Sequence, residues 1–320
     1  MIGRGQILAL TSSKGGVGKT HLAVSLSAAL GKRDAYVLLI DADMGNGIIS
    51  DRLGLSPNGN LAHFFLKERA LEDLIERTPF DFSLIAGEQG NLALANHNYL
   101  QEMKFLRSFI CISRNYDFVL LDLAPGINRQ TIDLALLADR TIIVTSPNDL
   151  MSGYASVRGC FSRFTQLEAD LFKRLEGYKA RQFFRPLILM NHVTSLYQGE
   201  AAFEALESAV EKQLNTPVSP FGIKMGHLGS IFHDPALFKK SEDNQCPVSL
   251  VSAYSKVAIC VDSMASVICA RSPFRGFYEK ERLRHIIQSL MEQQAGLSRL
   301  LTRKASKIPP IRIPSHHSNG

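Results

Sequence analysis

A glycine-rich stretch at residues 13–20, Ser-Lys-Gly-Gly-Val-Gly-Lys-Thr, constrains this chain more than any other feature. It follows the apolar run Ile7–Ser12, which has the length of a strand, and it precedes a helical pattern over Thr20–Leu30. A glycine-dense turn between a strand and a helix N-terminus binds phosphate, because backbone N–H groups point inward and the helix dipole favours negative charge. The pattern therefore predicts that the chain binds a nucleoside triphosphate.

Individual residues of this loop have distinct expected tasks. Lys19 is expected to reach the β- and γ-phosphates, and the Thr20 hydroxyl is expected to bind Mg²⁺. The residues expected to contact the nucleotide are seven consecutive ones: Lys14, Gly15, Gly16, Val17, Gly18, Lys19 and Thr20. A strict pattern would begin with glycine where this sequence has Ser13, but the two lysines support the interpretation.

Apolar runs alternate with helical patterns along the chain. Several runs lack polar alternation, which indicates strands buried on both faces of a mainly parallel sheet. The predicted strands are Ile7–Ser12, Tyr36–Asp41, Phe82–Ala86, Phe118–Asp122, Thr141–Ser146, Leu187–Asn191 and Pro217–Phe221. The predicted helices are Thr20–Leu30, Leu100–Asn115, Thr131–Ala138, Tyr154–Leu175, Ala201–Leu214 and Ser252–Cys269. This order predicts a doubly wound α/β fold with helices on both faces and ligands at the carboxyl ends of the strands.

Two predicted strands end in carboxylates. Asp41 and Asp43 follow the second strand, and Asp122 ends the strand Phe118–Asp122. An aspartate at the tip of a hydrophobic strand holds Mg²⁺ in P-loop enzymes, which is the role expected of Asp122. For Asp41 and Asp43 the residue pattern alone leaves two alternatives, a site near the phosphates and an ordinary turn or helix cap.

The loop with two lysines resembles the deviant Walker A loop of the MinD/ParA group of P-loop ATPases. The resemblance covers roughly residues 5–270 and is closest to the FlhG/FleN branch, through Asp41-Ala-Asp-Met-Gly45, Leu53-Gly-Leu55 and Asp122-Leu-Ala-Pro-Gly126. It implies the MinD-like P-loop fold, ATP and Mg²⁺ as cofactors, and a homodimer that forms in the ATP state. It also implies slow ATP hydrolysis, which separates the two subunits.

The resemblance further implies roles for single residues. Lys14, Lys19 and Asp43 are the expected catalytic residues: Lys14 crosses the dimer interface to the partner's ATP, and Asp43 polarises the attacking water. The implied Mg²⁺ site consists of three side chains, Thr20, Asp41 and Asp122. Gly126 resembles the glycine whose N–H senses the γ-phosphate. Asn191 matches an asparagine that hydrogen-bonds adenine, and Pro220 lies where the group has a proline loop against the base.

Positive charge is concentrated at the C-terminal end of the chain. Residues 272–320 carry nine Lys or Arg and three Asp or Glu, which equals the whole net charge of +6. Apolar residues there fall at helical spacing: Leu283, Ile286, Ile287, Leu290, Met291, Leu297, Leu300 and Leu301. We therefore expect an ATPase domain over residues 1–271, a basic amphipathic helical segment over 272–306 and a disordered tail over 307–320.

The amphipathic segment has alternative interpretations. It can lie in a membrane interface when dimerisation presents two copies, or it can dock on the protein's own sheet or on an unidentified protein partner. No apolar run approaches the roughly 20 residues of a membrane span. The first strand begins within about six residues, which leaves no room for a signal peptide. We therefore expect a cytoplasmic protein, with peripheral binding at the inner face of the cell membrane if the segment is an anchor.

The expected function is that of an ATP-dependent dimerising switch. In the FlhG-like branch it regulates flagellar placement or number, or positions a similar assembly at a cell pole or membrane. The first alternative is a ParA-like partitioning ATPase that binds DNA nonspecifically, which we favour less; its affinity would fall steeply with salt. The second is a metabolic P-loop enzyme, which would need a substrate site, and the sequence contains no second group of polar residues resembling one.

Overall fold

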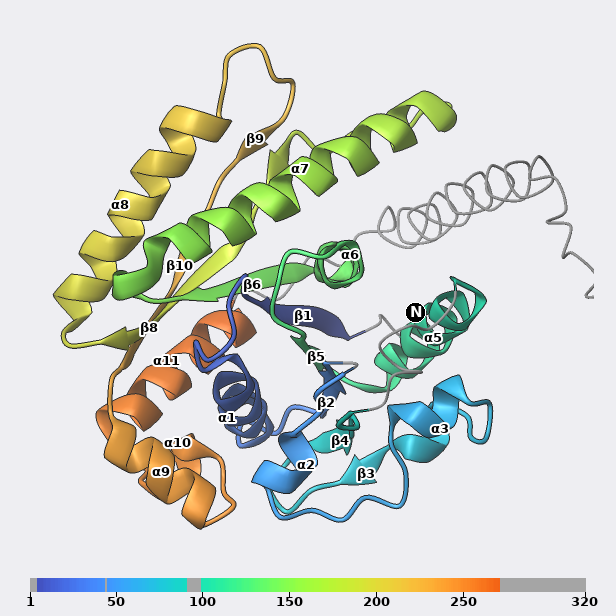
Figure 1. The fold of residues 1–320 in the computed structure, drawn as a ribbon, viewed down its shortest axis with the longest axis vertical. Helices are drawn as coiled ribbons and strands as arrows, with labels where there is room; N and C mark the ends of the chain where they lie inside the picture. Colours follow the sequence, from blue (N-terminus) through green and yellow to red (C-terminus); the bar gives the residue numbers. More distant parts are fainter. Residues whose placement is uncertain (1–4, 44, 91–98, 271–320) are drawn as a thin grey trace, which may run out of the picture.

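The computed structural model describes residues 5–43, 45–90 and 99–270. The segment expected at 272–306 and the tail at 307–320 lie outside the described residues. The described chain is built around an eight-stranded sheet with the order β10-β8-β6-β1-β5-β2-β4-β3 (Figure 1). These strands are β1 Gln6–Thr11, β2 Val37–Ala42, β3 Glu76–Arg77, β4 Ser83–Ile85, β5 Phe118–Leu123, β6 Arg140–Thr145, β8 Leu187–Val193 and β10 Gly226–Phe232. All neighbouring strands are parallel except β3, which is antiparallel to β4.

Helices cover both faces of this sheet (Figure 1). One face packs against α1 Lys19–Gly31, α9 Pro235–Asp243, α10 Val248–Val251 and α11 Lys256–Ala270, with the one-turn α2 Ile49–Arg52 at its margin. The other face packs against α3 Leu61–Phe65, α5 Tyr99–Ile112, α6 Arg129–Leu137, α7 Leu150–Arg174 and α8 Leu196–Leu214. Short 3₁₀ turns occur at Glu72–Leu74, Ser113–Asn115 and Pro147–Asp149. The predicted doubly wound, mainly parallel α/β fold is confirmed.

The central strand β1 shows why the apolar runs lacked polar alternation. Its residues Ile7 and Ala9 belong to the cluster under α5 and α6, whereas Leu8 and Leu10 belong to the cluster under α1. All four are fully buried. Because successive side chains of a strand point to opposite faces, a strand covered on both sides must be apolar at every position.

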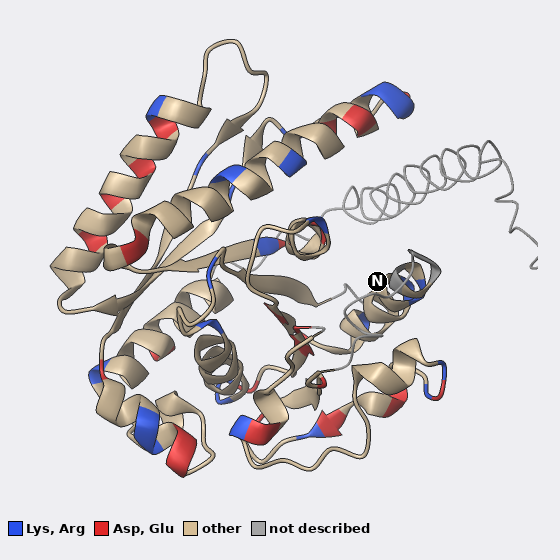
Figure 2. Ribbon diagram, in the orientation of Figure 1, with Lys and Arg blue, Asp and Glu red and all other residues tan. Residues whose placement is uncertain are grey.

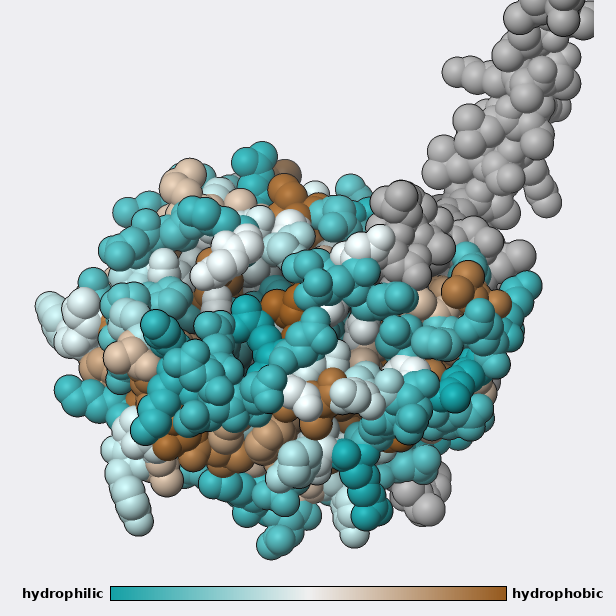
Figure 3. All heavy atoms as spheres, turned by 60° about the horizontal axis from the view of Figure 1, so that its bottom comes forward, coloured by the Kyte–Doolittle hydropathy of each residue, from teal (hydrophilic) through white to brown (hydrophobic). Residues whose placement is uncertain are grey.

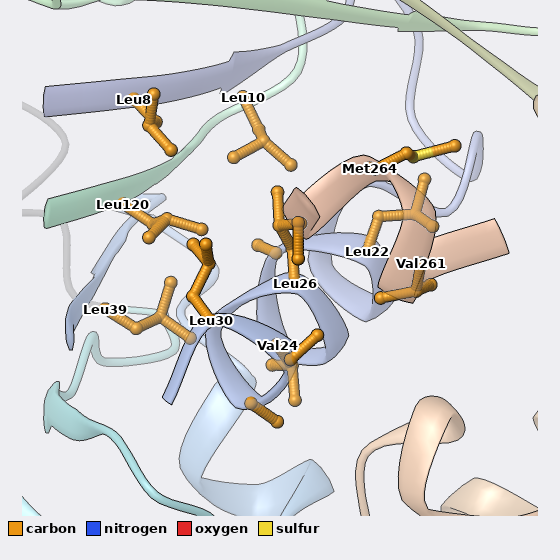
Figure 4. Close-up of a cluster of buried hydrophobic side chains, with 14 of the residues drawn as sticks. Leu8, Leu10, Leu22, Val24, Leu26, Leu30, Leu39, Leu120, Val261 and Met264 are labelled. Carbon is orange, nitrogen blue, oxygen red and sulfur yellow. The ribbon is translucent and has the colours of Figure 1, made fainter. Parts of the chain in front are cut away.

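Helix α1 lies deeper than a typical surface helix. Leu22 and Leu26 pack with Val261 and Met264 of α11, while Leu30 points toward the sheet (Figure 4). The helix is therefore enclosed by the sheet on one side and by α10 and α11 on the other. Burial of this helix fixes the glycine-rich loop that precedes it.

The prediction of a strand at Pro217–Phe221 is wrong. The structure has instead a small two-stranded sheet of β7 Phe183–Phe184 and β9 Gly222–Ile223, followed by the edge strand β10. A proline has no N–H for a strand ladder, so Pro217 and Pro220 disfavour the predicted position. No helix among the described residues is long and apolar enough to cross a membrane.

Candidate nucleotide-binding site

The glycine-rich loop connects the end of β1 to the start of α1 at the centre of the sheet. Gly16 and Gly18 have φ angles of 78° and 86°, which side-chain-bearing residues rarely adopt. Gly18 is the N-cap of α1, no side chain caps the first turn, and that turn contains no acidic residue. The uncapped N–H groups of α1 are thus available to an anion.

Lys19 lies below this loop, next to a carboxylate from the neighbouring strand. Its Nζ is 3.1 Å from Oδ1 of Asp122, at the carboxyl end of β5. The two side chains are only 8% and 1% exposed, so the ion pair is nearly shielded from water. A buried lysine and a buried carboxylate in contact neutralise each other's charge, and removing either leaves the other uncompensated.

Asp41 lies beside Asp122, because these residues are register partners on β2 and β5. Asp41 is buried, and its Oδ2 accepts a 3.0 Å hydrogen bond from the N–H of Ile49. Burial, reinforced by the negative charge of Asp122, raises the pKa of Asp41 to about 8. Burial also raises the pKa of Asp43, and attraction to Lys19 opposes that shift. The carboxylates predicted for the site therefore lie together at the carboxyl ends of the inner strands β2 and β5.

These oxygen atoms suit Mg²⁺. The expected donors are the hydroxyl of Thr20 and the carboxylates of Asp41 and Asp122, which are hard ligands. The described residues contain no group of three or more His, Cys, Asp or Glu placed to hold a metal on their own. Mg²⁺ does not need one, because it binds one or two carboxylates together with phosphate oxygens and water.

Gly126 lies in the turn after β5, facing the same loop. Its N–H donates a 2.8 Å hydrogen bond to the carbonyl of Ser12, and its φ is 116°. The turn after the Asp122 strand is thereby attached to the start of the glycine-rich loop. A non-glycine residue would be strained at this φ, which accounts for glycine here.

Lys14 points to a different place from Lys19. Its Nζ is 3.1 Å from Oδ2 of Asp149, directly before α7, and its side chain is 66% exposed. The hydrogen bond from Lys14 lowers the pKa of Asp149. The adjacent Ser13 donates a 2.7 Å hydrogen bond to the carbonyl of Ser152. The first lysine of the loop is therefore a surface group at the start of α7, while the second is buried.

Asn191, near the carboxyl end of β8, is fully buried against the loop. Its Nδ2 donates a 2.7 Å hydrogen bond to the carbonyl of Val17, and its Oδ1 accepts one from the N–H of His192. His192 has a φ of 59°, and its Nδ1 is 3.1 Å from Nδ1 of His233, just after β10. Sequence reasoning missed both histidines, because the predicted strand Leu187–Asn191 stopped before His192 and β10, which His233 follows, was not recognised.

Pro220 is not brought to this edge. It is exposed and precedes β9, which leads into the amino end of β10. The glycine-rich loop lies at the carboxyl ends of the parallel strands, so Pro220 is at the opposite edge of the sheet (Figure 1). The segment that does follow the strand next to β8 is His233-Asp234-Pro235, and the N-cap signal of Asp234 before Pro235 could have located it.

A glycine-rich loop between a central strand and a buried helix, with a lysine–aspartate pair below it, defines a P-loop nucleoside triphosphatase. A family model described as an AAA domain matches residues 5–168, and the chain belongs to that family as a P-loop ATPase of the MinD/ParA type, close to FlhG. Members of this family use ATP with Mg²⁺.

Several known proteins are similar over most of their length. The antiactivator FleN of Pseudomonas aeruginosa is 25% identical over 265 residues, which cover 82% of this chain and 86% of FleN. The flagellum site-determining protein YlxH of Helicobacter pylori is 22% identical over 272 residues, covering 84% and 83% of the two chains. The septum site-determining protein MinD of Pyrococcus horikoshii, solved with Mg-ADP, superposes with a TM-score of 0.60 at 21% identity, covering 85% of this chain and 99% of MinD.

Proposed function

We propose that this protein is an ATP-driven dimerising switch that controls the placement or number of flagella, or of a comparable assembly at a cell pole or membrane. The single observation that carries the proposal is the cluster of Lys19, Asp41, Asp43 and Asp122 around a P-loop. The flagellar role in this proposal is supported by the similarity to FleN and YlxH over more than four-fifths of each chain.

In this proposal the buried side chains hold the nucleotide. Lys19 exchanges part of its interaction with Asp122 for the β- and γ-phosphates, and the loop N–H groups complete the cradle. Thr20, Asp41 and Asp122 hold Mg²⁺, which when bound neutralises phosphate charge. Gly126 would change partner from Ser12 to the γ-phosphate, and Asn191 would face the base. Because the N–H of Gly126 is hydrogen-bonded to Ser12 at the start of the loop, nucleotide binding to the loop can change the conformation of the turn that contains Gly126.

Asp43 is the proposed water-positioning residue. It is only half-buried and lies near Lys19, as its raised pKa and the opposing attraction indicate. A carboxylate in that position can accept a hydrogen bond from an attacking water. We expect Asp43→Ala to bind ATP and to dimerise in ATP, but to lose turnover. Hydrolysis by Asp43→Ala at the wild-type rate, in a phosphate-release assay, would refute this role.

Lys14 is the proposed contact to a second subunit. Its partner Asp149 is at the surface, and exposed ion pairs contribute little, so Lys14 can leave Asp149 at small cost. A cation delivered from a second subunit would neutralise charge on the transferring phosphoryl group. Ile127 and Met151, which follow β5 and β6 at the same edge, are exposed apolar residues that a second copy could cover.

The partner surface beyond the dimer belongs to the proposal as well. We propose that residues 272–306 bind the membrane peripherally, that residues 1–271 form a cytoplasmic ATPase domain, and that residues 307–320 form a tail.

The DNA-binding alternative finds little support on α8, where four exposed glutamates follow one another along the helix: Glu200, Glu204, Glu207 and Glu211 (Figure 2). On the face drawn in Figure 3, hydrophobic side chains emerge in limited patches between hydrophilic ones.

One experiment separates the alternatives. The full chain is sedimented with anionic liposomes and, separately, with duplex DNA, each with and without ATP. We expect ATP-dependent pelleting with liposomes, lost on deletion of residues 272–320 while ATP binding is retained. Salt-sensitive binding to DNA in ATP would favour the partitioning alternative. A truncated protein that aggregates, from a parent that never bound liposomes, would show that the segment docks on the protein itself.

A further inference from the structure

A cluster of three side chains joins the first turn of α1 to α2 and α9. Nη1 of Arg52 lies 2.7 Å from Nε2 of His21 and also donates to Oε1 of Glu242. His21 Nε2 is 3.2 Å from the same Glu242 oxygen, and its ring meets Phe238 edge-on. Of the three elements, α9 comes from a distant part of the sequence, and His21 directly follows Thr20 of the glycine-rich loop.

The helix that carries Arg52, α2, depends on tertiary contacts for its stability. α2 is a single turn, and helices of that length are unstable without tertiary contacts. Its first residue, Ile49, is buried and donates its N–H to Oδ2 of Asp41. Its last residue, Arg52, reaches the His21–Glu242 pair. One end of α2 therefore contacts the proposed Mg²⁺ site, and the other is attached to α1 and α9.

We propose that Arg52 is a positioning residue for Mg²⁺: its Nη1 holds α2 against α1 and α9, and α2 in turn orients Asp41 through the Ile49 N–H. The inference rests on the proposed role of Asp41 in the Mg²⁺ site. The guanidinium suits this task because its planar donors keep a fixed direction, which a lysine ammonium does not. Its Nε is buried without a hydrogen-bond partner, so the side chain is held by Nη1 at its tip.

The chain contains a matched control in Arg33. Arg33 binds Asp262 at 2.7 Å and Ser266 at 2.8 Å, joining the other end of α1 to α11. The two arginine side chains are similarly exposed, 25% for Arg33 and 31% for Arg52. Arg33→Ala thus removes a comparable link from the turn that directly follows α1, at the end away from the glycine-rich loop.

The test measures ADP binding by calorimetry in EDTA and at graded Mg²⁺ concentrations. Arg52→Ala should raise the Mg²⁺ concentration needed for half of the Mg²⁺-dependent gain in affinity by about tenfold, as for other residues that support a metal ligand. Its ADP affinity in EDTA should stay within about twofold of wild type, since the phosphate cradle is untouched. Arg33→Ala should change neither quantity, even if it lowers the melting temperature.

A second readout needs neither nucleotide nor metal. Hydrogen–deuterium exchange of the peptide covering residues 45–55 should accelerate in Arg52→Ala and not in Arg33→Ala, because α2 loses its attachment. If Arg52→Ala does not fold, Glu242→Gln replaces it, with smaller shifts in the same direction expected. Unchanged Mg²⁺ dependence, or equal shifts in Arg33→Ala, would overturn the inference. Wild-type protein that binds no ADP would instead contradict the proposed function.

Discussion

At the scale of the residue, Lys19 and Asp122 depend on each other. Both are nearly fully buried and 3.1 Å apart, so removing one leaves the other as an uncompensated charge. We expect Lys19→Ala to abolish ATP binding and to lower the free energy of unfolding of the nucleotide-free protein by about 3–5 kcal/mol. Calorimetry and urea unfolding measure the two effects, with the exposed Lys32→Ala as control. Retained ATP binding would contradict the assignment of Lys19 to the phosphates.

Asp41 makes the stability of the nucleotide-free protein depend on pH. Its pKa is about 8 in the folded protein and near 3.8 in an unfolded chain, so the folded state holds an extra proton between those values. Stability should therefore fall as pH rises through that window, because the unfolded chain releases the proton that the folded state retains. Urea unfolding in EDTA between pH 5 and 8 should show a shallower fall for Asp41→Asn than for wild type. The exposed Asp34→Asn should behave as wild type, and parallel curves for all three would refute the prediction.

At the scale of the element, the contact between the glycine-rich loop and β8 requires a residue without a side chain at position 18, which is Gly18. A Cβ on Gly18 would lie 2.3 Å from Nδ2 of Asn191, whereas one on Gly16 would meet nothing within 4 Å. Both residues have positive φ, so Gly16→Ala carries the backbone cost alone, about 1–2 kcal/mol. We expect Gly18→Ala to be clearly less stable than Gly16→Ala in thermal unfolding, since it also breaks the Asn191–Val17 hydrogen bond. Equal melting temperatures would contradict this account.

Elements buried on both faces could be predicted from sequence, and edge elements could not. β5 and β6 were predicted within about one residue at each end, because each contains an uninterrupted apolar run, Phe118–Leu121 and Ile142–Val144. β10 was missed because it is an edge strand with Gly226, Gly229 and register shifts in its pairing. In the site, Asp122 could be predicted from its place at the tip of an apolar strand, whereas for Asp41 and Asp43 the resemblance to the MinD/ParA group decided between two alternatives. The Lys14–Asp149 pair and the His192–His233 contact did not, since they join loops whose positions depend on tertiary packing.

At the scale of the whole molecule, the two lysines of the loop predict different assembly behaviour. Lys14 is exposed at the start of α7, so Lys14→Ala should bind ATP as a monomer with near wild-type affinity. It should fail to form the ATP dimer, because the cation offered to the second subunit is gone. Size-exclusion chromatography with light scattering in ATP tests this. A stable dimer of Lys14→Ala would leave an ordinary P-loop ATPase without the proposed cross-subunit contact, and Asp43→Ala serves as the dimer-forming comparison.

The enclosure of α1 sets an order of events during synthesis. A ribosome releases β1, the loop and α1 first, but the strands on either side of β1 and the covering helix α11 emerge much later. Until Val261 and Met264 arrive, Leu22 and Leu26 have no cover on their outer side (Figure 4). Nascent chains in that interval expose apolar surface that invites aggregation or chaperone binding. Although α1 is among the first elements to be synthesised, it is therefore among the last to be fully buried.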